Sequence, residues 1–234
     1  MKNTQVCKSC GTENPFYVST CKKCNFIIRD KIVNIDLWSA IARLLESPVI
    51  AFRSIIQAEH KNFVVSIILF ASVKFSIDTA FLSMLLYNRG YEGGSIFSNL
   101  ILAIILLVII LFLYSFIIKI ITKASEAKTR LKDNLAVFTY SIMPHSLALC
   151  IVFPIEIAVF GANMFSTNPS PFLLKPPLAY ILSGFEVLIF IWSIFLAVVG
   201  MYSQTRSKAF GISAGLIFNI LLLSELYFLS VSMK

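Results

Sequence analysis

The feature that most constrains this chain is an apolar run over residues 96–121, in which residues 100–118 carry no charge. As a helix those uncharged residues would span roughly 27 Å, close to the thickness of a bilayer's hydrocarbon core. A soluble domain rarely buries so long a helix on every face. In lipid the same helix satisfies all of its backbone polar groups internally. The run therefore predicts a membrane protein.

The rest of the chain predicts an all-α polytopic membrane protein. Its 234 residues are 58% hydrophobic and only 14% charged, a balance that is typical of this class. Apolar periodicity predicts five transmembrane helices within residues 63–234, at about 63–87, 96–121, 135–163, 178–203 and 209–231.

Basic residues predict the orientation of these helices. The loop after the second span and the loop after the fourth are basic, through Lys119, Lys123, Lys128, Arg130, Lys132, Arg206 and Lys208. The opposite loops carry only Arg89 and Lys175. The positive-inside rule then places the basic N-terminus in the cytosol and the C-terminus outside. This placement explains the net charge of +8 without nucleic acid, which we do not expect as a partner.

Four cysteines predict a metal site in residues 1–31. Cys7 and Cys10 form one CxxC pair, and Cys21 and Cys24 form another after ten intervening residues. Each pair places two thiolates on one tight turn, and two such turns complete a tetrahedral site. An all-sulfur site suits structural zinc, so we predict a small N-terminal zinc ribbon.

Two alternatives to zinc are a pair of disulfides and a redox-active CxxC. Disulfides need an oxidising compartment, whereas the predicted topology puts this end in the cytosol. A redox motif would usually sit beside a βαβ pattern, which this sequence lacks. So short a module cannot build a core without metal, and we expect it to be a platform for an unidentified cytosolic protein.

Residues 35–61 predict two amphipathic helices ahead of the first span. In the first, Trp38, Ile41 and Leu44 fall on one face, opposite charged and polar residues. Ser47-Pro48 reads as the start of the second helix. Neither helix is apolar enough to span, so the pair would lie in the membrane interface or pack on the cytosolic end of the bundle.

Ionisable residues inside the predicted spans are candidate functional residues. They are Lys74, Asp78, Glu156, Glu186 and Glu225. Helical rise places all four carboxylates in the outer half of the bundle, facing a single lysine. One hypothesis is a cation or proton site. The other is that Lys74 neutralises one carboxylate while the others are protonated or reach external headgroups. We expect His145, which follows Pro144, to be a satisfied polar group and not a ligand.

These features together resemble a known family, the Yip (Ypt/Rab-interacting protein) membrane domain. The residues that carry the resemblance are Ser47-Pro48-x-x-x-Phe52, Tyr140 followed three residues later by Pro144, and a helix running from Trp192 to Gly200. The resemblance implies a scaffold more than a catalyst, since eukaryotic members are associated with Rab GTPases and vesicle traffic. A cysteine ribbon ahead of such a domain looks like a prokaryotic arrangement, in the cytoplasmic membrane.

The sequence therefore predicts an integral membrane scaffold or adaptor whose ribbon binds a protein partner. The alternative is a small ion- or proton-coupled transporter that uses the outer-half carboxylates. No nucleophile motif, phosphate-binding glycine loop or HExxH motif is present, so we do not expect an enzyme. We expect the lipid bilayer as a partner, and we also consider a homo-oligomer, in which the partner is a second copy of the chain.

Overall fold

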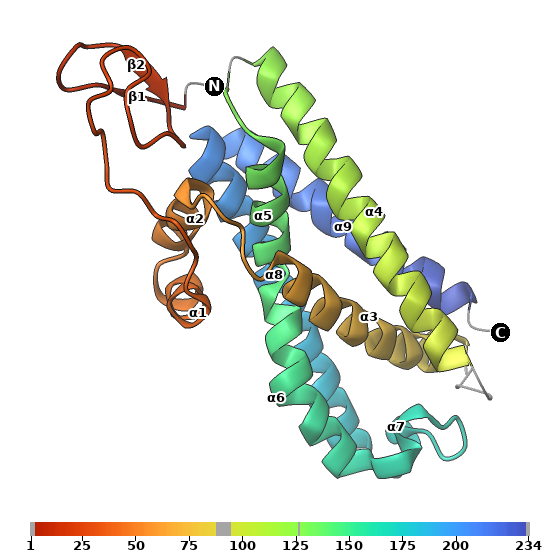
Figure 1. The fold of residues 1–234 in the computed structure, drawn as a ribbon. Helices are drawn as coiled ribbons and strands as arrows, with labels where there is room; N and C mark the ends of the chain where they lie inside the picture. Colours follow the sequence, from red (N-terminus) through yellow and green to blue (C-terminus); the bar gives the residue numbers. More distant parts are fainter. Residues whose placement is uncertain (1–2, 88–94, 126, 233–234) are drawn as a thin grey trace. The chain divides into compact units, whose positions relative to one another are not determined.

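The computed structural model describes residues 3–87, 95–125 and 127–232, which are mostly helical (Figure 1). Within these residues, five stretches are long and apolar enough to cross a membrane: Val64–Tyr87, Phe97–Ala124, Leu131–Phe165, Pro176–Thr205 and Lys208–Ser232. They confirm the predicted fold class, an all-α polytopic membrane protein. Arg89, used above for orientation, lies outside the described residues.

The third of these stretches is built from separate helical pieces. Helix α5 covers Leu131–Ser141, α6 covers Met143–Phe160, and the 3₁₀ turn η1 covers Gly161–Phe165. Pro144 lies in the first turn of α6, where its missing N–H is tolerated and where it cannot continue the hydrogen-bond ladder of α5. Pro154 lies inside α6 without ending it. Only one of the two prolines thus interrupts the span.

The chain divides into two compact units. The first contains Met1–Val64, Leu111–Ser141 and Phe195–Phe218, and the second contains Val65–Ile110, Ile142–Ile194 and Asn219–Lys234. Helices α4 (Ser95–Ala124), α8 (Pro176–Thr205) and α9 (Lys208–Ser232) contribute residues to both units.

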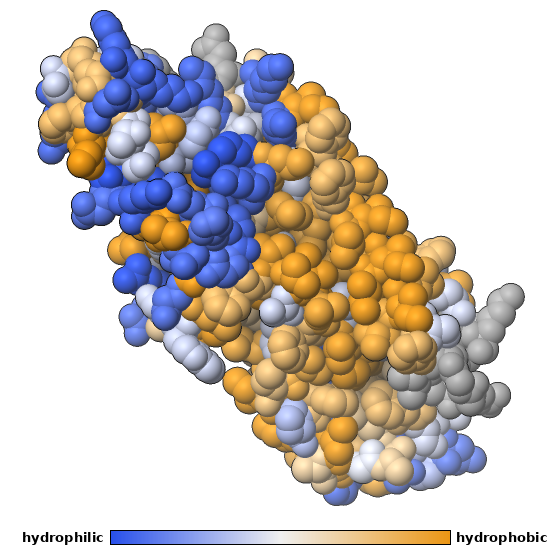
Figure 2. Space-filling view, in the orientation of Figure 1, coloured by the Kyte–Doolittle hydropathy of each residue, from blue (hydrophilic) through white to orange (hydrophobic). Residues whose placement is uncertain are grey.

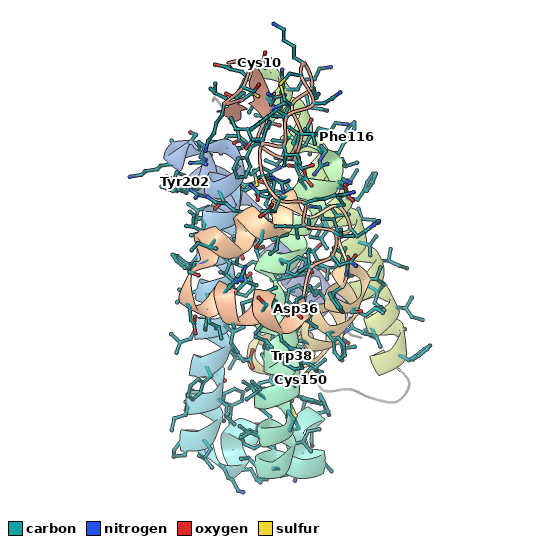
Figure 3. The ribbon with its side chains drawn as sticks, turned by 60° about the vertical axis from the view of Figure 1, so that its left-hand side comes forward. Cys10, Asp36, Trp38, Phe116, Cys150 and Tyr202 are labelled. Carbon is teal, nitrogen blue, oxygen red and sulfur yellow. The ribbon has the colours of Figure 1, made fainter. Side chains whose placement is uncertain are left out.

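The first unit begins with a small hairpin and two short helices. Strands β1 (Thr4–Val6) and β2 (Glu13–Pro15) pair antiparallel, and α1 (Leu37–Glu46) and α2 (Pro48–Gln57) follow. The carboxylate of Asp36 accepts a hydrogen bond from the backbone N–H of Ser39 at 2.6 Å and so caps α1 (Figure 3). Trp38 is 78% exposed, as an aromatic anchor in a membrane interface would be.

The core of the first unit is aromatic. Tyr114, Phe138 and Phe218 contact one another with ring centroids 4.6–5.7 Å apart. The hydroxyl of Tyr114 donates a hydrogen bond of 2.7 Å to the backbone carbonyl of Ala214. This bond satisfies the one polar atom that the ring would otherwise bury.

Glycines allow helices of the first unit to approach closely. A methyl group at Gly200 of α8 would lie 2.7 Å from Val137 Cγ1 and 3.0 Å from the ring of Phe52. A methyl group at Gly215 of α9 would lie 2.7 Å from the backbone nitrogen of Val198. Small residues permit this backbone approach, on which helix packing in membranes depends.

A buried ionic cluster joins α2 to the start of α5. The ammonium of Lys61 donates to the backbone carbonyls of Ile55, Ile56 and Ala58 at the C-terminal end of α2. It also pairs with the carboxylate of Asp133 at 3.0 Å, and Arg130 Nε donates to the same carboxylate at 2.6 Å. Burial lowers the pKa of Lys61 to about 8, and the negative charge of Asp133 opposes that shift.

The second unit contains α3 (Val64–Tyr87), except for its first residue, together with α6 and the short helix α7 (Pro171–Leu174). Its apolar core centres on Phe160, Met164, Ala179 and Leu182. His145 is buried between the rings of Phe75 and Phe190, with centroids 4.8 and 5.4 Å away. Neither ring nitrogen of His145 has a hydrogen-bond partner among the described residues, contrary to the expectation of a satisfied polar group.

Surface hydropathy agrees with a membrane setting. Figure 2 shows hydrophobic residues dominating the visible surface of the long helices and hydrophilic residues dominating that of the N-terminal segment. Large apolar side chains such as Phe112, Leu113 and Phe116 of α4 are about half exposed. Lipid tails are the solvent that such a surface suits.

Candidate metal centre and intramembrane polar cluster

The four cysteines of the N-terminal segment converge on one point. Their sulfur atoms all lie within 4.8 Å of one another, and Cys10 is labelled in Figure 3. The sulfurs of Cys7 and Cys24 are 3.6 Å apart, as are those of Cys10 and Cys21. Disulfide sulfurs would be about 2.05 Å apart, whereas zinc–sulfur bonds of about 2.3 Å place tetrahedral ligands roughly 3.8 Å apart. The arrangement fits a metal ion.

The two cysteine turns have the same backbone geometry. The N–H of Gly11 donates to the carbonyl of Cys7, and the N–H of Asn25 donates to that of Cys21, both at 3.0 Å. Gly11 and Asn25 have φ of +67° and +58°, which these residue types adopt at low cost. The sequence pattern Cys-x-x-Cys-Gly/Asn thus forms two equivalent turns.

Asn14 ties the two turns together, a role that the sequence analysis did not identify. Its side-chain N–H group donates to the carbonyl of Thr12 at 2.9 Å and to the sulfur of Cys21 at 3.4 Å. Its side-chain oxygen accepts from the N–H of Lys22 at 3.0 Å. Backbone N–H groups of Cys24 and Lys23 lower the pKa of Cys21 to about 6.

The cysteine module is held against α8 and against the residues that precede α5 and follow α8, all in its own unit. The buried side chain of Asn3 donates a hydrogen bond to the backbone carbonyl of Gln204. The guanidinium of Arg130 lies 4.2 Å from the ring centre of Tyr17, and that of Arg206 lies 5.4 Å from the ring centre of Phe16. Both distances are within the range of cation–π attraction. The module is therefore docked through several independent contacts.

A second cluster of charges lies within the second unit. Lys74 of α3 is fully buried and forms an ion pair with Asp78, one turn further along the same helix. Its ammonium also lies 2.8 Å from a carboxylate oxygen of Glu186 on α8. One lysine thus joins two carboxylates from different helices.

A small pocket opens beside this ion pair. It has a volume of about 150 Å³ and is lined by Asp78, Glu156 and Glu186, together with Ser183 and apolar side chains. Glu156 of α6 is 97% buried, and its Oε2 has no hydrogen-bond partner among the described residues. With one ammonium for three carboxyl groups, the pocket can hold a proton or a small cation.

Glu225, the fifth predicted residue, is not part of this pocket. It lies on α9 and is 3% exposed. Neither of its carboxylate oxygens has a hydrogen-bond partner in the part of the chain that the structure describes. The structure thus brings together four of the five predicted intramembrane residues.

The residues of the sequence motifs occupy structural positions. Ser47 ends α1 and precedes Pro48, the first residue of α2. The hydroxyl of Tyr140 donates to the carbonyl of Asn62 at 2.7 Å. Gly200 faces Phe52. Pro144 is the second residue of α6, and Trp192 lies on α8 with 37% of its surface exposed.

Comparison with known proteins gives one family. The family model described as the Yip1 domain matches residues 42–231, well over half of the chain. No curated protein and no solved structure matches the chain.

Proposed function

The chain belongs to the Yip1 domain family, and from this premise we propose that it is an integral membrane scaffold whose N-terminal ribbon binds a protein partner. The proposal includes structural zinc at Cys7, Cys10, Cys21 and Cys24, a cytosolic N-terminus and an external C-terminus. It places the protein in a prokaryotic cytoplasmic membrane and assigns it no enzymatic activity.

The observation that carries the proposal is the exposed apolar surface of the ribbon. Ile27 is 66% exposed, Val6 60% and Phe26 44%, although the module is only about thirty residues long. Asn3, Phe16 and Tyr17 meanwhile fix the module to Gln204, Arg206 and Arg130 of its unit. Apolar side chains exposed on a fixed platform are typical of a protein interaction site.

A photo-crosslinking residue at position 27 tests this role in cells. We expect a discrete crosslinked protein, which disappears when Cys24→Ser removes a metal ligand and persists in Cys150→Ser. Cys150 is an exposed cysteine of α6 outside the metal cluster, labelled in Figure 3. Crosslinks to lipid alone would contradict partner binding, and a product of twice the chain's mass would identify the partner as a second copy.

The intramembrane pocket supports a second candidate, a small ion- or proton-coupled transporter. The supporting observation is that Asp78, Glu156 and Glu186 line one pocket with a single buried lysine beside it. Intramembrane ionisable groups often mark ion pathways.

Thermal stability in detergent, measured across pH and a panel of cations, tests the second candidate. A ligand that binds the native state raises stability by mass action. A saturable gain for one cation that is lost in Asp78→Asn and Glu186→Gln would support transport and lead to flux assays. A flat response would leave these carboxylates with a structural role.

A further inference from the structure

A separate, wider pocket lies beside the C-terminal end of α4, entirely within the first unit. Its volume is about 660 Å³, within the range of small-molecule sites. Lys119 and Lys123 of α4 and Lys128 of the following segment line it, and Tyr17 and Glu13 of the N-terminal module line it too. Neither of the candidate sites above uses these lysines.

The charges of this pocket favour an anion. None of the three lysine ammonium groups forms an ion pair or a hydrogen bond within the described residues. The one carboxylate in the lining, that of Glu13, accepts a hydrogen bond of 3.4 Å from the hydroxyl of Thr4. Among the described residues that line the pocket, three positive charges therefore face one negative charge.

The helix that carries the lysines indicates where the anion comes from. Lys119 directly follows the uncharged run of α4. Phe116 and Ile120 lie within one turn of Lys119 and Lys123 and are 45% and 54% exposed. Basic groups next to exposed apolar side chains at the end of a span match a phospholipid, whose phosphate and acyl chains meet at that depth.

We infer that this pocket binds the phosphate headgroup of an anionic phospholipid, with the acyl chains along the exposed apolar side of α4. The lysines attract the phosphate, and Phe116 and Ile120 contact the tails. A free phosphate compound would use only the first of these contacts.

Lipid binding to the full-length protein, purified in a neutral detergent, tests the inference. Phosphatidylglycerol is compared with phosphatidylcholine by titration, with one saturable site expected for the anionic lipid. The triple substitution Lys119→Gln, Lys123→Gln, Lys128→Gln should weaken that site on the order of 100-fold, since each lysine near an anionic headgroup contributes roughly fivefold. Glu13→Gln removes the opposing charge and should strengthen binding.

The matched control removes three exposed lysines outside the pocket and outside the cysteine turns, through Lys31→Gln, Lys132→Gln and Lys208→Gln. It should leave the affinity within a few-fold of the unmodified protein. If both triple variants lost affinity for phosphatidylglycerol equally, the effect would come from total charge and the inference would be overturned. Equal binding of phosphatidylglycerol and phosphatidylcholine would overturn it too. If glycerol phosphate bound as tightly as the lipid, the site would belong to a soluble phosphate compound instead.

Discussion

Gly200 shows at the scale of one residue why the helices of the first unit pack as they do. Gly200→Ala would place a methyl group 2.7 Å from Val137 Cγ1 and 3.0 Å from Phe52. Overpacking of this kind typically costs about 1–3 kcal/mol, so we expect a lower melting temperature in detergent.

Gly184→Ala on the same helix is the control for this substitution. A methyl group there would meet no atom within 4 Å. Its melting temperature should be unchanged or slightly raised, because alanine favours a helix over glycine. Equal behaviour of the two variants would mean that the close approach at Gly200 does not limit packing.

Asp133 makes a second prediction at the residue scale. Its side chain is 1% exposed and pairs with both Lys61 and Arg130. Asp133→Asn leaves those cations without their counter-charge, and breaking a buried pair in this way costs about 3–5 kcal/mol.

Chemical denaturation of Asp133→Asn, compared with Lys31→Gln, measures that cost. Lys31 pairs with Glu59 at 3.1 Å, but the two side chains are 57% and 45% exposed. Such a surface pair contributes about 0–1 kcal/mol, so Lys31→Gln should be nearly neutral. Similar losses in both variants would show that burial does not distinguish the two pairs.

At the scale of elements, we predict that the ribbon depends on a bound metal and that the adjoining helices depend on the ribbon. We expect one zinc ion per chain by elemental analysis and a lower melting temperature after chelation. Loss of the contacts of Tyr17 and Phe16 with Arg130 and Arg206 should contribute about 1–3 kcal/mol to that decrease.

Cysteine substitutions separate this metal effect from general thiol chemistry. Cys24→Ser should lose the zinc and reproduce the effect of the chelator, whereas Cys150→Ser should behave like the unmodified protein. Zinc should also be released on acidification, because its cysteine ligands bind as thiolates. If chelation did not change the melting temperature, metal binding by the ribbon would not contribute to the stability of the helices.

For the whole molecule, we predict that five spans place the two ends of the chain on opposite sides of the membrane. A phosphatase that is active only outside the cytosol should therefore be active when fused after Lys234 and inactive when fused after Arg206. The reverse pattern would contradict the orientation predicted from Lys119, Lys123 and the other basic residues.

The sequence was sufficient to predict those features that have a local cause. A span needs a long uncharged run, such as residues 100–118, because lipid offers no partner for backbone polar groups. A metal turn needs two cysteines separated by two residues. Both patterns are visible without knowing what the segment contacts.

Features that depend on distant parts of the chain were not predicted. Asp133 meets Lys61, which lies 72 positions earlier in the sequence, and neither residue belongs to a recognisable motif. Asn14 braces the metal turns only because the hairpin brings it beside Cys21. Glu225 was grouped with the other carboxylates by depth alone, and depth does not determine which face of a helix a side chain occupies.

The hydrogen bond between Asn3 and Gln204 has a consequence for biosynthesis. The two residues are 201 positions apart, so at usual translation rates roughly 10–40 s separate their synthesis. During that interval Phe16 lacks its contact with Arg206, and the aromatic surface around Phe16 stays open. Molecules that meet the ribbon during synthesis therefore find the aromatic surface around Phe16 uncovered, whereas the complete protein covers it. A folding factor that recognises this surface would act only on the nascent chain.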